Sequence, residues 1–202
     1  MDETAGSRTR LVVGLGNPGA RYEGTRHNVG YLVVEELAGR RSARFGRSEC
    51  NSLLAAAGDD LLLAKPLTYM NRSGYAARCL LERRDLDASS ILVVYDDVWL
   101  PLGRLRARPR GGPGGHRGME SIVNSLRTPE IGRLRLGVGW EGGPPEGVDL
   151  VEYVLEPFAE EDRGAVEALV GRAADACECW LDHGMEETMA RYNGLAEPID
   201  RG

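Results

Sequence analysis

A short apolar run near the start of the chain, Leu11 to Leu15, leads directly into the glycine loop Gly16-Asn17-Pro18-Gly19. A continuous apolar run bounded by glycines is typical of a buried strand. A second run of this kind, Ile91 to Tyr95, ends on two acidic residues. Between the two runs, apolar residues at 29, 32, 33 and 37 follow a helical spacing. Because strands alternate with helices, we predict an α/β domain.

Apolar spacing and turn residues place the other elements. The predicted strands are 53–57 and 61–64, joined as a hairpin at 58–60, then 102–108, 134–140 and, as a further candidate, 151–155. The predicted helices are 29–40, 71–84 with Asn71 as N-cap, 117–126, 159–181 and 186–192. We find no internal repeat and no interdomain linker. The hairpin indicates that the sheet is mixed.

Length and cysteine usage fit one cytoplasmic domain. A chain of 202 residues is long enough for one full core. No segment approaches the roughly 18 consecutive apolar residues of a membrane helix, and the polar start is not a secretory signal. The cysteines form no CxxC pair, so we expect thiols in a reducing compartment rather than a metal site or a disulfide framework. They are Cys50, Cys79, Cys177 and Cys179.

The net charge of −6 hides an uneven distribution. Residues 1–100 carry 13 basic and 13 acidic side chains, whereas residues 141–202 carry four arginines against 16 acids. Residues 101–140 carry eight arginines against two glutamates, a net charge of +6. A polyanion that binds the protein contacts such a local basic patch, so the net charge of the whole chain does not exclude one. The alternation over 102–108 places Arg104, Arg106 and Arg108 on one strand face.

The first loop has the glycine spacing of a dinucleotide-binding site, Gly14-x-Gly16-x-x-Gly19. In that motif a helix opens at the last glycine, and its N-terminus holds a pyrophosphate. Here the next predicted helix begins well beyond Gly19, and no acidic residue ends a clear second strand about 20 residues later. We keep dinucleotide binding only as a minor alternative.

A histidine and a carboxylate lie near the ends of two predicted strands. Neighbouring parallel strands share one crevice at their carboxyl ends, so we expect Asn17 and Asp96 to lie close together. His27, one of three histidines, sits between the glycine loop and the first helix. A carboxylate fixes the tautomer of a histidine and raises its basicity, which suits a general base. Asp97 is the alternative partner, and helix capping without chemistry is the alternative role for His27.

Two further segments are candidates for the rim of this crevice. Thr68-Tyr69-Met70-Asn71 precedes a helix, either as a plain cap or as a polar and aromatic rim. The glycine-rich loop 109–116, which ends at His116, is either a surface connection or a flexible lid near phosphate. Because we find no GxSxG motif and no cysteine with an obvious histidine partner, we expect an activated water rather than a covalent nucleophile.

Five motifs, taken in order along the chain, resemble bacterial peptidyl-tRNA hydrolase. They are GLGNPG with Tyr22, TRHNVG (25–30), KPLTYMNRSG (65–74), DD followed by LPLG (96–103), and GGHRG (114–118). The resemblance covers residues 10–193, with 1–9 as a disordered N-terminal tail and 194–202 as a C-terminal tail. It implies a single α/β domain, with a twisted mixed β-sheet flanked by helices, that needs no cofactor and no metal.

The resemblance also implies an enzyme that hydrolyses the ester bond between tRNA and a peptide or N-blocked amino acid. Free tRNA from prematurely released chains then returns to translation. His27 would be the base that activates water, Asp96 its partner, and Asn17 the position that distinguishes blocked from free aminoacyl-tRNA. Tyr22, Tyr69 and Asn71 would contact the tRNA 3′ end, and Met70 the peptide channel. The implied protein is a cytoplasmic monomer with no membrane contact and no obligate protein partner. Our own candidates for phosphate contacts are Arg104, Arg106, Arg108 and Arg133.

One position departs from the family. Arg117 follows His116, where the family commonly has an asparagine that helps to position water or the tRNA end. A guanidinium donates hydrogen bonds but does not accept them, so we expect Arg117 to meet tRNA phosphate instead. Because His27, Asp96, Asn17 and Asn71 are intact, we expect activity to be retained. A catalytically weak RNA-binding protein of the same fold is the alternative.

Overall fold

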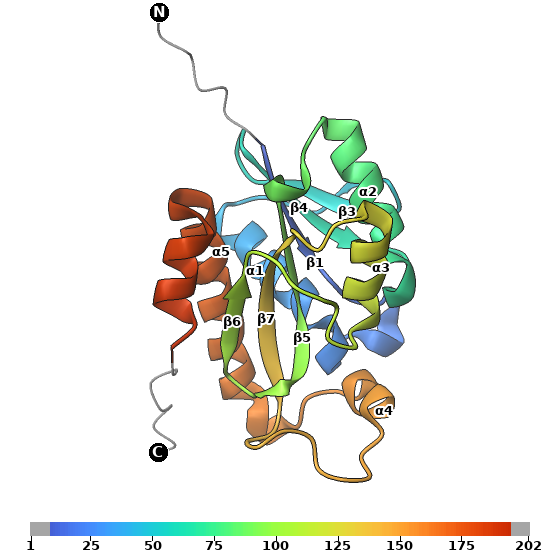
Figure 1. The fold of residues 1–202 in the computed structure, drawn as a ribbon, viewed down its shortest axis with the longest axis vertical. Coiled ribbons are helices and arrows are strands. Elements are labelled where there is room, and N and C mark those ends of the chain that lie inside the picture. Colours follow the sequence, from blue (N-terminus) through green and yellow to red (C-terminus); the bar gives the residue numbers. More distant parts are fainter. Residues whose placement is uncertain (1–8, 195–202) are drawn as a thin grey trace, which may run out of the picture.

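Seven strands form one mixed sheet in the computed structural model of the chain, which describes residues 9–194 (Figure 1). The strand order is β2-β3-β4-β1-β5-β7-β6. Strands β4, β1, β5 and β7 are parallel, whereas β3 and β6 run antiparallel to their neighbours. The strands are β1 (Arg10–Gly14), β2 (Arg47–Glu49), β3 (Ser52–Ala56), β4 (Leu61–Pro66), β5 (Ile91–Pro101), β6 (Leu105–Arg108) and β7 (Gly132–Gly139).

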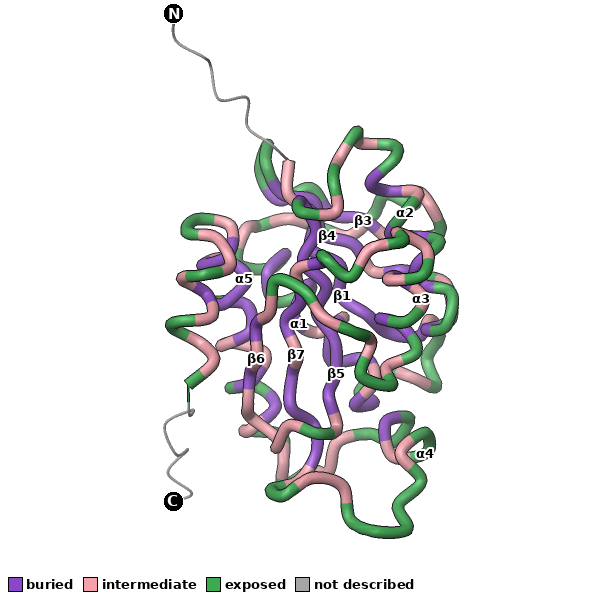
Figure 2. The backbone as a smooth tube through the Cα atoms, viewed as in Figure 1, coloured by how far each residue is buried: buried purple, intermediate pink, exposed green. Residues whose placement is uncertain are grey.

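Helices cover both faces of this sheet. Val12 of β1 belongs to the core that α1 and α5 close, whereas Leu11 and Val13 belong to the core under α2 and α3. A strand buried on both faces has to be apolar throughout, and the interior strands are buried in Figure 2. The helices are α1 (Val29–Arg40), α2 (Ser73–Arg84), α3 (Arg117–Leu126), α4 (Leu150–Leu155) and α5 (Arg163–Tyr192).

The predicted α/β class with a mixed, helix-flanked sheet is confirmed. Helices α1 and α3 have the predicted ends. The two predicted C-terminal helices form α5, which Gly184 interrupts with a non-helical φ of 81°. No helix within residues 9–194 combines the length and apolar character that a membrane span needs. Apart from Thr9 and Gly194, the two predicted tails lie outside the described residues.

Two predicted elements were wrong, and one strand was not predicted. Asn71 does not cap α2, because it lies inside the 3-10 turn η3 (Met70–Arg72) and α2 starts at Ser73. Segment 151–155 is part of helix α4 rather than a strand, because Asp149 caps it by accepting the backbone N–H groups of Val151 and Glu152. The short strand β2 was not predicted, since its sequence Arg-Ser-Glu carries no apolar signal.

Two cysteines are bonded, against the prediction of four thiols. Cys50, in the β2–β3 turn, and Cys79, on α2, form a disulfide with Cα atoms 5.6 Å apart. Their sequence spacing does not reveal this pair, because the two segments meet only in the folded chain. Cys177 and Cys179 are free and buried. Burial raises the pKa of the Cys177 thiol.

Reduction of this disulfide is expected to destabilise the fold. The bond joins residues separated by 29 positions and restricts the unfolded chain. Loop entropy for this separation predicts a loss of about 3.5 kcal/mol in the free energy of unfolding. Urea unfolding with and without dithiothreitol measures this loss. The control is Cys50→Ser, whose unfolding should not respond to dithiothreitol. Equal stability of oxidised and reduced wild type would contradict the role of the cross-link.

Candidate active site

The neighbouring parallel strands β1 and β5 bring their carboxyl ends to one edge of the sheet. β1 ends at Gly14, which pairs with Val94, whereas β5 continues to Pro101. Asp96 therefore lies within β5, which corrects its predicted position just after a strand ending at Tyr95. Because β1 has already ended, the loop after β1 reaches the same edge of the sheet as Asp96.

His27 reaches this edge from a single 3-10 turn, η2 (Arg26–Asn28). The start of α1 packs directly on strand backbone: a Cβ on Gly30 would lie 2.4 Å from the carbonyl oxygen of Val94 and 2.5 Å from the nitrogen of Leu15. Only glycine permits this approach. Gly30 thereby lets the turn carry His27 close to β5.

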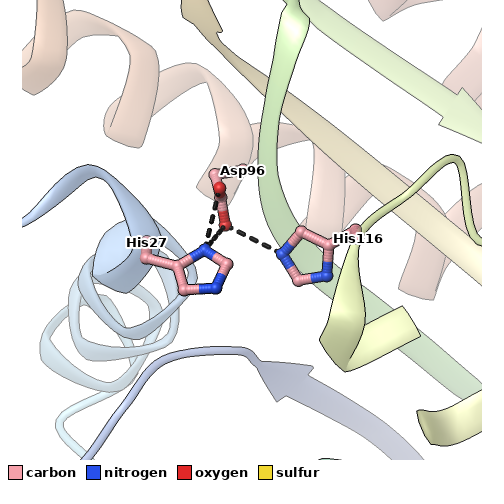
Figure 3. Close-up of side chains that lie close together, drawn as sticks. All are labelled: His27, Asp96 and His116. Atoms are coloured by element: carbon pink, nitrogen blue, oxygen red, sulfur yellow. Dashed lines mark hydrogen bonds and ion pairs between the residues drawn. The ribbon is translucent and has the colours of Figure 1, made fainter. Parts of the chain in front are cut away.

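Asp96 is the centre of a hydrogen-bonded group with two histidines (Figure 3). His27 Nδ1 lies 2.9 Å from each carboxylate oxygen, and His116 Nε2 lies 3.0 Å from Oδ1. The Asp96 side chain is 2% exposed. Burial alone would raise the pKa of Asp96, but His27 and His116 outweigh burial and hold the pKa of this carboxyl well below its usual value. Asp96 is therefore ionised at neutral pH.

The ring tautomers follow from the groups around His116. Its Nδ1 caps α3 by accepting the backbone N–H groups of Gly118 and Met119, both at 3.2 Å. An accepting ring nitrogen carries no proton, so neutral His116 has its proton on Nε2 and donates it to Asp96. His27 also donates its Nδ1–H, because an ionised carboxylate only accepts. The lone pair on His27 Nε2 is left free, as a general base requires.

The same three side chains have the composition of a metal site, with candidate ligand atoms within 4.8 Å of one another. Their hydrogen bonds do not fit that role. A metal on His116 Nε2 would displace the only proton of the neutral ring, because Nδ1 already caps α3. The arrangement instead favours a carboxylate that orients two imidazoles.

Hydrogen bonds to Met70 and Asn28 fix both the side chain and the backbone of Asn17. Its Oδ1 accepts the backbone N–H of Met70 at 2.8 Å, and its backbone exchanges two hydrogen bonds with the Asn28 side chain, at 2.8 and 3.0 Å. Because the N–H of Met70 only donates, the amide oxygen of Asn17 has to face it. The NH₂ group is the part of the Asn17 side chain left for the cleft that this residue lines.

The two neighbours of His27 fix the turn. Arg26 is 8% exposed and donates to the carbonyl oxygens of Tyr153 and Glu156, at 3.1 and 3.3 Å. Its guanidinium lies 4.0 Å from the centroid of the Tyr153 ring, which adds a cation–π contact. Asn28 binds the loop after β1 through Asn17. Neither role was predicted, although both residues belong to the motif 25–30.

A cleft of about 570 Å³ surrounds the His27–Asp96 pair. Arg104 and Arg106 do not line it and lie half-buried on or beside β6. Leu105 and Ala107 of β6 are buried and Arg106 and Arg108 are not, as the predicted alternation requires. The predicted site residues in the wall of the cleft are Asn17, Tyr22, His27, Tyr69, Met70, Asn71, Asp96, Arg108, Arg117 and Arg133.

Arg133 is not free to bind phosphate, which corrects its predicted role. It is 2% exposed. Its guanidinium donates to the carbonyl oxygens of Gly112, Pro129 and Ile131, at 2.8, 3.0 and 3.2 Å. These bonds fasten the glycine-rich loop at Gly112, so Arg133 supports the wall of the cleft from inside.

Two alternative interpretations do not fit this geometry. Asp97 pairs with Arg135 and accepts the backbone N–H of Trp99 at 2.9 Å, so it is not the partner of His27. The glycine loop leads into a 3-10 turn, η1 (Ala20–Tyr22), and the first α-helix begins only at Val29. No α-helix N-terminus opens at this loop to hold a pyrophosphate.

His116 is the main functional residue that sequence reasoning missed. The prediction placed it only at the end of the glycine-rich loop. The available signal was its position directly before a helix, where a side chain that accepts hydrogen bonds acts as N-cap. A histidine that caps through one ring nitrogen presents the other to a neighbour, here Asp96.

Comparisons with known proteins agree with one another. The family model described as peptidyl-tRNA hydrolase matches residues 11–200. A peptidyl-tRNA hydrolase from Methylacidiphilum infernorum is 47% identical over 87% of this chain and 93% of its own length. The one from Bacillus subtilis is 40% identical over 91% of this chain and 97% of its own length. The solved structure of peptidyl-tRNA hydrolase from Acinetobacter baumannii is 28% identical, with a TM-score of 0.84, and the match covers 94% of this chain and 96% of that one.

The lowered pKa of Asp96 predicts how stability depends on pH. The ionised Asp96 side chain adds its full contribution to the free energy of unfolding when the pH is above 3.8, the ordinary pKa of this carboxyl. The contribution is lost as the pH falls from 3.8 through the lower pKa that Asp96 has in the folded protein. Asp96→Asn should be about 2 kcal/mol less stable than wild type at neutral pH, because charge-assisted hydrogen bonds are lost. This difference should narrow as the pH falls below about 4, as measured by urea unfolding.

The control is Asp59→Asn, which changes an exposed carboxylate in the β3–β4 turn. It should follow the wild-type pH profile. If the difference between wild type and Asp96→Asn stayed constant down to strongly acidic pH, the lowered pKa of Asp96 would be refuted.

Proposed function

The chain belongs to the peptidyl-tRNA hydrolase family, and we propose that its cleft hydrolyses the ester between peptide and tRNA with His27 as the general base. One observation carries this assignment of roles. Asp96 accepts a hydrogen bond from the Nδ1–H of His27, so His27 Nε2 has a free lone pair in the cleft wall. A reaction that starts with proton removal from water needs such a group.

The geometry supports a direct hydrolysis. His27 Nε2 takes a proton from water, and the resulting hydroxide attacks the ester carbonyl carbon. Ionised Asp96 stabilises the imidazolium that forms, and His116 holds Asp96 in place. The imidazolium then gives its proton to the departing 3′ oxygen of the tRNA. The products are a peptide carboxylic acid, which then loses its proton to solvent, and tRNA with a free 3′ hydroxyl, so atoms and charge balance without a cofactor.

Asn17 supplies the selectivity for N-blocked substrates in this proposal. Its NH₂ group is the part left for the cleft, because Met70 occupies its oxygen. An amide NH₂ donates to a peptide carbonyl oxygen, whereas it faces a free ammonium group donor to donor. Blocked and free aminoacyl-tRNA therefore differ in the hydrogen bonds that they make with this side chain.

The tRNA contacts are assigned by exposure and charge. Tyr69 is 56% exposed on the cleft wall, where an aromatic ring stacks with an unpaired base. Tyr22 and Asn71 lie on the same wall. Arg108 and Arg117 line the cleft, and Arg104 and Arg106 extend the basic surface along β6; together these arginines supply phosphate contacts. Met70, 4% exposed, lines the peptide channel.

The cellular role follows from the chemistry. Release of tRNA from prematurely terminated peptides supports translation and ribosome rescue. The Cys50–Cys79 disulfide removes the cysteine argument for a reducing compartment. We place this activity in the cytoplasm because translation takes place there, and assign it to a monomer that binds peptidyl-tRNA without a membrane or an obligate protein partner. The second candidate, an RNA-binding protein with weak activity, is favoured only by Arg117 at the family's usual asparagine position.

His27→Ala tests the proposal directly. The variant should release N-acetyl-amino acid from N-acetyl-aminoacyl-tRNA about 10²–10⁴-fold more slowly than wild type, because general-base assistance is lost. His183→Ala, which changes an exposed histidine of α5, is the matched control and should keep the wild-type rate. The hydrolase assignment fails if wild type does not cleave, and the role of His27 fails if His27→Ala cleaves at the wild-type rate.

Arg117→Asn separates phosphate binding from chemistry. The variant should change the rate at low salt modestly and reduce the slope of log(kcat/KM) against log[salt] by about 0.7–0.9, the value for one lost phosphate contact. Arg127→Asn, at the opposite end of α3, is the control and should keep the wild-type slope. An unchanged slope in Arg117→Asn would show that Arg117 does not meet phosphate.

A further inference from the structure

The cleft has an apolar wall that the hydrolysis does not use. We infer that Trp99, together with Val151 and Leu155 of α4, binds an apolar side chain of the substrate peptide about three residues from the ester. The protein would then prefer peptidyl-tRNAs whose peptides are apolar at that position. This inference rests on the proposed function, because its ligand is the peptide part of the same substrate.

The exposure of these side chains points to a ligand. Trp99 is 61% exposed, Val151 50% and Leu155 37%. Within residues 9–194, the large apolar side chains with such exposure are Leu67, Tyr69, Tyr75, Trp99, Val148, Val151 and Leu155. More than half of them line the one cleft that contains His27 and Asp96. Apolar side chains gathered in a concave site mark binding of apolar groups.

Trp99 is held in position rather than loosely attached. Its backbone N–H donates to Asp97 Oδ1 at 2.9 Å, and Asp97 is in turn paired with Arg135 of β7. The indole lies against Gly143, where a Cβ would be 3.5 Å from the ring. Because the backbone of Trp99 is anchored and its ring is supported, the Trp99 side chain loses less conformational entropy when a ligand binds.

The α4 part of the apolar wall is held by Arg26, which lies in the same turn as His27. Arg26 holds the carbonyl oxygens of Tyr153 and Glu156. The Tyr153 ring lies 4.1 Å from that of Trp140, and its hydroxyl donates to the Val138 carbonyl oxygen at 2.6 Å. The apolar wall and the base therefore keep a constant relative position.

The spacing between Asp96 and Trp99 indicates which residue of the substrate peptide can contact the Trp99 side chain. Trp99 follows Asp96 by three positions on β5, across the irregular segment between Asp97 and Pro101, so their backbones lie at most about 10 Å apart. A peptide advances about 3.3–3.6 Å per residue, so its third residue from the ester reaches Trp99. An N-acetyl-aminoacyl group is too short to do so.

Charge assigns this wall to the peptide rather than to tRNA. The arginines proposed for phosphate contacts in the cleft, Arg108 and Arg117, lie on β6 and at the start of α3, whereas the apolar wall lies on the end of β5 and on α4. A phosphate backbone binds the former, and an apolar peptide side chain binds the latter.

The experiment compares three substrates with the same tRNA: N-acetyl-Gly-, N-acetyl-Gly-Gly-Gly- and N-acetyl-Leu-Gly-Gly-tRNA. Wild type should cleave the leucine substrate with a KM about tenfold lower than the triglycine substrate, at similar kcat. Trp99→Ala should abolish this preference and leave cleavage of N-acetyl-Gly-tRNA within about twofold. Trp99→Phe should retain most of the preference, because the apolar surface remains.

Tyr75→Ala, which removes an exposed aromatic ring of α2 outside the cleft, is the matched control and should keep the wild-type preference. If wild type cleaves all three substrates without preference, or if Trp99→Ala retains the preference, the inference is overturned while the proposed function stands. If wild type cleaves none of them, the proposed function itself fails. A concentration-dependent dimer that Trp99→Ala dissociates would also overturn the inference, in favour of a second copy on this wall.

Discussion

The turn Arg26–Asn28 is the constraint on which the site depends. A 3-10 turn has three residues per turn, so three consecutive side chains point in three directions. Arg26 binds the α4 segment, His27 binds Asp96 on β5, and Asn28 binds the loop after β1. One short turn thereby connects three parts of the molecule that are distant in sequence. A shift of this turn would move the base, the apolar wall and Asn17 together.

The buried carboxylate of Asp96 lies between two imidazoles and determines which ring nitrogens of His27 and His116 carry a proton. Asp96 accepts from both rings, and the helix cap at His116 leaves that ring only one nitrogen from which to donate. Each ring therefore has a single neutral tautomer. The lone pair that can accept a proton from water is on His27 Nε2. An asparagine at position 96 would keep an acceptor but would lose the charge that stabilises an imidazolium. The pair thus combines orientation with electrostatic support.

The sequence predicted the elements whose signal is local. Continuous apolar runs marked β1 and β5, and helical spacing marked α1 and α3. The shared crevice at the carboxyl ends of two predicted parallel strands was enough to predict that Asn17 and Asp96 lie close together, with His27 beside the carboxylate. Arg133 was misjudged because a basic segment of sequence does not show which of its arginines the fold buries. The Cys50–Cys79 bond and the contacts of His116 and Arg26 depend on tertiary packing, which no local pattern contains. Segment 151–155 was misjudged because a short apolar run fits a strand or a helix, and its cap, Asp149, decides between them.

The tautomers of the two rings matter most, because the free lone pair of His27 depends on them. Nitrogen-15 NMR of histidine side chains at neutral pH, with long-range couplings to the ring protons, reports which nitrogen carries the proton. Signals are assigned by comparison with His27→Ala, His116→Ala and His183→Ala. We predict a protonated Nδ1 and a free Nε2 in His27, and the reverse in His116. A proton on Nε2 of neutral His27 would contradict the proposed mechanism, since that nitrogen would then have no lone pair with which to activate water.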